Sequence, residues 1–108
     1  MKKIEAYIKP HRLTEVTMAL QRVEGLRGVS VLAVRGFGRK EDSGSHHLGI
    51  DDLKDFSEHT KIEIFCADDL VEELVTVIDK SASTGLRGDG KIYVSDVDRA
   101  YKIGKGEI

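Results

Sequence analysis

Two hydrophobic repeats alternate along this chain, and their order limits the fold more than any other feature of the sequence. Apolar and polar residues alternate in residues 4–8, as they do in a half-buried strand. Apolar residues then recur at helical spacing between residues 13 and 23, which predicts an amphipathic helix. The later apolar segments are strand-like at 29–34, 61–66 and 91–97, and helical at 70–78. The order β-α-β-β-α-β predicts an α+β, ferredoxin-like sandwich, and residues 1–108 suit a single domain of this kind.

One face of the predicted sheet has no helix to cover it, because two helices can cover only the other face. The side chains expected on the open face are Tyr7, Leu32, Val34, Phe65 and Val97, mixed with Glu5 and Glu63. This set is too apolar to remain in water, so we expect the chain to associate with itself over this face. Symmetry considered alone would favour a dimer.

A basic, glycine-rich loop is predicted between the second helix and the last strand, at residues 84–92. Its glycines are Gly85, Gly88 and Gly90, and its charged side chains are Arg87, Asp89 and Lys91. Glycines let the backbone turn where a Cβ would block it, and the bare amides can then point at an anion. Asp89 can brace such a turn through hydrogen bonds to the backbone. A helix C-cap followed by a tight turn would explain Gly85 but not the two cations, so we expect a polyphosphate ligand.

The connection at residues 39–60 is too long for the hairpin that it should close. Ordinary hairpin loops take about 2–5 residues, and structureless loops beyond about 12–15 residues usually have a function. This segment is polar and acidic and has few apolar residues. It is therefore predicted to be a partner-docking arm; the alternative is a tolerated insertion.

Composition excludes several classes of protein. The net charge of −2 gives no basic field for nucleic acid, and Phe65 and Tyr93 are too few aromatics for an RNA-binding sheet. A single cysteine, Cys66, excludes a disulfide scaffold and a paired-cysteine metal carrier. No apolar stretch suits a membrane span or a signal peptide, so we expect a cytoplasmic protein that does not insert into membranes. No group of side chains suggests a nucleophile or a catalytic base, so we expect no enzyme.

Four segments, in order and at matching spacing, resemble the PII signal-transduction family. They are residues 1–10 (MKKIEAYIKP), 34–39 (VRGFGR), 61–64 (KIEI) and 84–92 (TGLRGDGKI). They resemble that family's first strand, the start of its long T-loop, its third strand and its B-loop. The resemblance implies a homotrimer that binds ATP or ADP in clefts between subunits. It also implies control of a target protein, either a membrane transporter or a metabolic enzyme, through a T-loop at about 39–60, with the B-loop at about 83–91.

The resemblance also implies which residues bind the nucleotide. The backbone at Gly36, Phe37 and Gly38 would approach it, and Arg39, Gly88, Asp89 and Gly90 would meet the phosphates, with Arg87 adding charge and Lys91 as the main cation. Ile8, Ser30, Glu63, Phe65 and Thr84 would frame the base and ribose. For Ile8 and Phe65 the alternative is a place in the core, and for Ser30 it is an ordinary strand position.

The chain departs from the family pattern at the phosphates. The positions of two phosphate-binding arginines hold Lys102 and Gly104, with Lys105 nearby. Lysine supplies charge without a bidentate fork, and glycine supplies neither. We therefore expect nucleotide binding through Lys102 with a weakened preference for the third phosphate.

A second departure concerns Mg²⁺ and 2-oxoglutarate. The family's metal-binding glutamine and carboxylate-binding lysine are replaced by Lys40 and His59. A protonated ammonium cannot ligate Mg²⁺ and would repel it, so we do not expect the usual Mg²⁺–2-oxoglutarate site. The T-loop also lacks a tyrosine for uridylylation, because Tyr7, Tyr93 and Tyr101 all lie outside it.

Three histidines, His46, His47 and His59, lie in or beside this loop. Histidines and carboxylates can bind transition metals, but adjacent histidines point apart in an extended chain, so the sequence does not predict a metal site. An alternative function remains open, in which the chain keeps the nucleotide site and regulates a heavy-metal transporter in response to nucleotide or metal.

Overall fold

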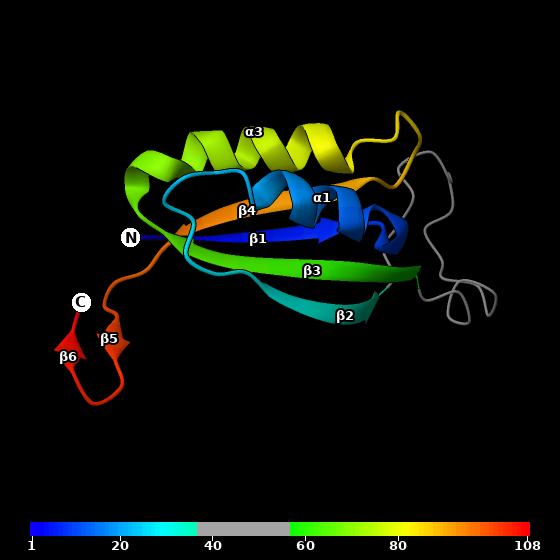
Figure 1. The fold of residues 1–108 in the computed structure, drawn as a ribbon. Helices are drawn as coiled ribbons and strands as arrows, with labels where there is room; N and C mark the ends of the chain where they lie inside the picture. The colour runs from blue at the N-terminus through cyan, green and yellow to red at the C-terminus, as the bar shows by residue number, and fades with distance from the viewer. Residues whose placement is uncertain (37–56) are drawn as a thin grey trace.

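A computed structural model describes residues 1–36 and 57–108. The strands are β1 (Lys2–Ile8), β2 (Ser30–Gly36), β3 (Ser57–Cys66), β4 (Gly90–Asp96), β5 (Tyr101–Lys102) and β6 (Gly106–Glu107). The helices are α1 (Leu13–Leu20) and α3 (Val71–Ala82), each preceded by a short 3-10 turn, η1 (Pro10–Arg12) and η2 (Asp68–Leu70). Figure 1 shows both α-helices over one face of the sheet, with the β5–β6 hairpin extending from its far end.

The four long strands form one sheet in the order β2-β3-β1-β4, and every neighbouring pair is antiparallel. This order, with two helices on one face, is the α+β ferredoxin-like arrangement that the sequence predicted. The register sets Ile8, at the end of β1, opposite Thr60 on one side and Gly90 on the other. The end of β1 therefore adjoins the start of β4, where the glycine-rich loop ends.

The core lies between the sheet and the helices and is built from alternate strand residues. Ile4, Ala6 and Ile8 of β1 are at most 1% exposed. β3 and both helices supply most of the rest of the buried set, which includes Ile62, Ile64, Val16, Leu20, Leu74 and Ile78. Burying such aliphatic side chains is the main favourable term in folding, so this face fixes the register of the sheet.

Several element boundaries differ from the sequence prediction, and those of β3 and of the first helix differ by several residues. β3 begins at Ser57 instead of Lys61, so its first four residues, which were assigned to the T-loop, are strand. They pair with β2 from Ala33 to Gly36, and this pairing satisfies their backbone groups without apolar alternation. The first helix was expected to reach Val23 but ends at Leu20, and Val23 is buried in the turn that follows.

The open face of the sheet carries exposed aromatic and apolar side chains, as predicted for Leu32 and Phe65. Phe65 is 53% exposed and Leu32 44%, and Tyr93, which the sequence analysis did not assign to this face, is 52% exposed. Val97 was expected there but lies beyond the end of β4, where its amide bonds the carbonyl of Met1. Such a face still has apolar area available for a partner.

A network of opposite charges crosses the same face. The Nζ atom of Lys61 lies 2.8 Å from Glu5 Oε2 and 2.8 Å from Glu63 Oε1. Lys3 Nζ approaches Glu5 Oε1 at 3.5 Å. The hydrogen bond from Lys61 lowers the pKa of Glu5, and the hydrogen bonds to both carboxylates raise the pKa of Lys61. The face therefore carries balanced charge between its apolar patches.

Candidate functional site

The loop between α3 and β4 needs its glycines for backbone geometry. Gly85, Gly88 and Gly90 have φ angles of 76°, 78° and 118°, a region that residues with a Cβ rarely adopt. At Gly90 space is a second constraint, because a Cβ there would lie 1.6 Å from the carbonyl oxygen of Tyr7. The sequence predicted that these glycines let the backbone turn where a Cβ would block it. Their positive φ angles agree with that prediction.

The carboxylate of Asp89 ties this loop together. Its Oδ2 accepts a hydrogen bond from the backbone amide of Thr84 at 2.9 Å, and its Oδ1 accepts one from the Thr84 hydroxyl. Lys9 Nζ lies 3.1 Å from Asp89 Oδ1. The hydrogen bonds from the hydroxyl and amide of Thr84, then the Lys9 ammonium, hold the pKa of Asp89 well below its usual range. The brace predicted for Asp89 therefore spans the loop to its first residue.

Lys9 is the residue of this loop cluster that the sequence analysis missed. It donates to Thr84 Oγ1 at 3.2 Å, while Leu86 N donates to the same oxygen at 3.1 Å. Lys9 follows the last residue of β1, which pairs with Gly90. No sequence pattern marks it, because only the β1–β4 register brings residue 9 beside residue 89.

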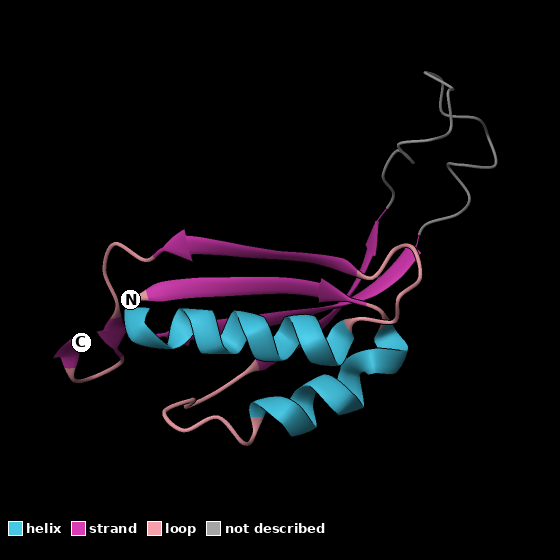
Figure 2. Cartoon of the chain, turned by 90° about the horizontal axis from the view of Figure 1, so that it is seen from above, coloured by secondary structure: helices cyan, strands magenta, loops and turns pink. Residues whose placement is uncertain are grey.

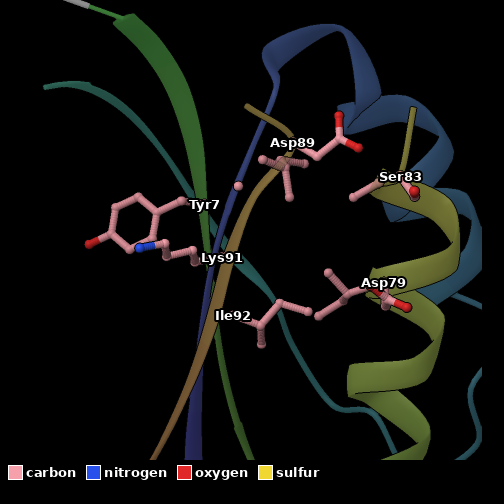
Figure 3. Close-up of a pocket in the computed structure, with 10 residues that line it drawn as sticks. Tyr7, Asp79, Ser83, Asp89, Lys91 and Ile92 are labelled. Carbon is pink, nitrogen blue, oxygen red and sulfur yellow. The ribbon is translucent and has the colours of Figure 1, made fainter. Parts of the chain in front are cut away.

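Lys91 and Asp89 lie on opposite sides of the strands, although residues two apart in a regular strand share a side. Gly90, which separates them, has a φ of 118° and interrupts that alternation. Figure 3 shows Lys91 beside Tyr7, and Asp89 with Asp79 and Ser83 on the helix side. Within the described ranges, Lys91 has no ion-pair partner. Its exposed ammonium is therefore available to an anion.

A hollow of about 240 Å³ opens beside the loop, between β4 and the end of α3. Apolar side chains, including Ile78, Ala82 and Ile92, line it together with the polar Asp79, Ser83 and Asp89 (Figure 3). Pockets that enclose a whole small molecule usually measure about 300–1,000 Å³. The hollow at this end of the sheet is thus smaller than a pocket that encloses a whole small molecule.

Two other described residues of the predicted site, Phe65 and Lys102, lie toward the opposite end of the sheet. Phe65 pairs with Lys3, and Lys3 lies five residues before Ile8 on β1, a span of roughly 17 Å. Phe65 and Lys102 line a second hollow of about 840 Å³, together with Arg27 and Lys105. Figures 1 and 2 show the hairpin that carries Lys102 at this end, far from the glycine-rich loop.

Most of the predicted nucleotide residues that the structure describes therefore fall into two groups within one chain. Ile8, Gly36, Thr84, Arg87, Gly88, Asp89, Gly90 and Lys91 belong to the loop end of the sheet. Phe65 and Lys102 belong to the hairpin end, and Ser30 and Glu63 pair with each other between β2 and β3. Glu63 is engaged by Lys61, as described above.

Several predicted residues cannot be placed in either group. Phe37, Gly38, Arg39, Lys40, His46 and His47 lie outside the described residues. His59 belongs to β3, opposite Val34. Across residues 1–36 and 57–108, no group of three or more histidine, cysteine or acidic side chains is arranged to hold a metal ion. In the same ranges no helix is long and apolar enough to cross a bilayer.

The fold and the loop define a small ferredoxin-like domain with a glycine-rich turn next to Lys91. A family model described as "Nitrogen regulatory protein P-II" matches residues 1–107. Curated proteins of that name from Bradyrhizobium diazoefficiens and Mesorhizobium japonicum are 48% and 45% identical over 107 residues. "Nitrogen regulatory protein P-II 1" of Escherichia coli is also 45% identical over 107 residues. Each of the three alignments covers 99% of this chain and 95% of the relative.

The chain therefore belongs to the P-II family of nitrogen regulatory proteins. The names of these relatives describe regulatory proteins and not enzymes.

Proposed function

We propose that this chain is a nitrogen regulatory protein that binds ATP or ADP and controls a target protein through its T-loop. The observation that carries the proposal is the loop at residues 84–91. Its left-handed glycines are braced by Asp89, and Lys91 beside them has no ion-pair partner among the described residues. Bare amides in such a turn, next to a lysine, suit the phosphates of a nucleotide.

The complete site would form between two copies of the chain. Within one chain, the loop residues and Lys102 lie at opposite ends of the sheet, and the hollow at the loop is too small for a nucleotide. A second copy that set its hairpin end against the loop would bring the two groups together. The exposed aromatic residues of the open face favour such association, and we propose the homotrimer that the family resemblance implies.

The ligand preferences follow from the residues that differ from the family pattern. Lys102 offers a charge in place of a guanidinium fork, and Gly104 offers neither, so ATP and ADP would bind with similar affinity. Lys40 and His59 replace the groups that would hold Mg²⁺ and 2-oxoglutarate. We therefore propose a sensor of adenine nucleotide that does not respond to 2-oxoglutarate.

Nucleotide would act on the target by favouring one conformation of the T-loop. Gly36, where β2 ends, would approach the nucleotide and also begin this loop. A ligand can shift such an equilibrium only by its difference in affinity for the two loop states. The target, a membrane transporter or a metabolic enzyme, would then bind or leave the loop.

Isothermal titration calorimetry with ATP, ADP and AMP tests the proposal, each with and without Mg²⁺ and 2-oxoglutarate. We expect ATP and ADP to bind with dissociation constants within about tenfold of each other. We also expect AMP to bind more weakly, and 2-oxoglutarate to leave the ATP affinity unchanged. An ATP-dependent rise in 2-oxoglutarate affinity would show that Lys40 and His59 do not abolish that site. An absence of heat with all three nucleotides at millimolar concentration would reject the function.

A further inference from the structure

Lys9 contacts the glycine-rich loop at its first residue, Thr84, and near its end, at Asp89. Its Nζ lies 3.2 Å from Thr84 Oγ1 and 3.1 Å from Asp89 Oδ1. Its stem passes near Gly88, where an added Cβ would lie 4.0 Å from Lys9 Cε. The side chain is 21% exposed, so most of it is shielded from water.

Asp89 poses an electrostatic problem for a loop that receives phosphate. A carboxylate beside a phosphate repels it, and the repulsion grows when water is displaced. Here both carboxylate oxygens are occupied by donors within the cluster of Lys9, Thr84 and Asp89. The carboxylate also points to the helix side of the strands, away from Lys91 (Figure 3). The charge of Asp89 is thus used to hold the loop.

We propose that Lys9 is a positioning residue of the nucleotide site, which neutralises Asp89 and binds it to Thr84 so that the loop amides face the phosphates. Lys9 and Lys91 then have different tasks. Lys91, without an acidic partner in the described chain, binds the ligand directly, whereas Lys9 acts through Asp89. The effect of Lys9 on nucleotide affinity rests on the function proposed above, whereas its effect on the conformation of the loop does not.

A double-mutant cycle separates action through Asp89 from direct contact with the ligand. The variants are Lys9→Met, Asp89→Asn and the double variant, and ATP affinity is measured by calorimetry. We expect Lys9→Met to weaken ATP binding by roughly tenfold in the wild-type background, because it leaves a partly buried carboxylate without its cation. In the Asp89→Asn background the same change should cost roughly twofold or less. Lys9→Arg, which keeps the charge, should restore most of the affinity.

Hydrogen exchange in the ligand-free protein tests the same inference without nucleotide. The amides of Thr84 and Leu86 donate to Asp89 Oδ2 and Thr84 Oγ1, so they report on the cluster directly. Lys9→Met should speed exchange at both amides. The amide of Ser83 bonds the carbonyl of Asp79 at the end of α3 and should be unaffected, which makes it an internal control.

The outcomes distinguish this inference from the function on which it builds. Equal losses of ATP affinity from Lys9→Met in both backgrounds would mean direct contact with the ligand and would overturn the inference. The inference would also be overturned if Lys9→Met left the ATP affinity unchanged, or lowered it no more than the control Lys80→Met on α3 does. If the wild type binds no nucleotide, the proposed function fails, and the exchange of Thr84 and Leu86 alone decides whether Lys9 holds the loop.

Discussion

At the scale of single residues, Gly90 is the position in the loop where the structure most strictly requires glycine. It pairs with Ile8, its φ is 118°, and a Cβ would lie 1.6 Å from the carbonyl oxygen of Tyr7. Gly88 also has a positive φ, of 78°, but a Cβ there would meet only Lys9 Cε, at an ordinary distance. Substituting each glycine by alanine therefore separates two contributions to the loss of stability. At Gly88 only the backbone conformation is strained, whereas at Gly90 a steric clash is added.

We expect Gly90→Ala to destabilise the protein more than Gly88→Ala does. The left-handed conformation alone should cost Gly88→Ala about 1–2 kcal/mol of unfolding free energy. Gly90→Ala adds the clash with β1, so the β1–β4 pairing must open at that end. Urea denaturation followed by circular dichroism measures both variants against wild type. Equal midpoints for the two variants would contradict the geometry of the loop.

Asp89 makes the stability of the loop depend on pH. Hydrogen bonds from Thr84 and then the Lys9 ammonium hold its pKa below the ordinary value of 3.8. Since the folded-state pKa lies below the unfolded one, the stabilisation is complete above about pH 4 and is lost as the pH falls through the folded value. Asp89→Asn should therefore be less stable than wild type near pH 7, and the difference should narrow toward about pH 2. Urea denaturation at each pH measures the two unfolding free energies. If their difference stayed constant between about pH 7 and pH 2, the ionised carboxylate of Asp89 would not stabilise the loop.

At the scale of secondary-structure elements, Arg12 connects η1 to the end of α3. Its Nε and Nη2 donate to the carbonyl oxygen of Ser81 at 3.0 and 2.6 Å. The last carbonyls of a helix have no partner within the helix, and a cation there also interacts favourably with the helix dipole. α3 leads directly into the glycine-rich loop, so this contact fixes where the loop begins.

We expect Arg12→Ala to lower the free energy of unfolding by about 1–2 kcal/mol, because it removes hydrogen bonds from a charged donor. Arg22→Ala, which removes an exposed arginine after α1, is the matched control and should change stability by less than about 0.5 kcal/mol. Thermal unfolding of the two variants tests this prediction. Equal melting temperatures would mean that the hydrogen bonds of Arg12 do not contribute to the stability of the protein.

Elements with strong periodicity could be predicted from the sequence, and elements made by pairing alone could not. Apolar alternation located β1, and helical spacing located α3. The first residues of β3 are polar and have no such pattern, so their pairing with β2 was missed. The glycines of the loop could be predicted because their conformation is a local property. Lys9 could not, because its contact with Asp89 depends on the register of two strands distant in sequence.

At the scale of the whole molecule, the open face of the sheet is the surface over which we propose that copies associate. Tyr93 is 52% exposed there and stacks edge-on against Tyr7, with ring centroids 6.1 Å apart. If copies associate over this face, a carboxylate at residue 93 would be buried beside a partner at high cost. We expect wild type to sediment as a trimer and Tyr93→Glu to dissociate. Thr76→Glu, on the exposed side of α3, is the control and should remain a trimer.

Sedimentation equilibrium measures the oligomeric state of the wild type and of both variants directly. A monomeric wild type would contradict the proposal that the nucleotide site forms between copies. A trimeric Tyr93→Glu variant would show that association uses a different surface.

We propose that the turn at residues 84–91 captures the phosphates of an adenine nucleotide, with Lys91 as the direct cation. Calorimetric titration of ATP into wild type and Lys91→Ala tests it most directly, with Lys80→Ala on α3 as a matched loss of charge. We predict that wild type and Lys80→Ala bind ATP with the same affinity, and that Lys91→Ala loses roughly tenfold or more. Equal affinities in all three proteins, or no binding by wild type, would contradict the claim.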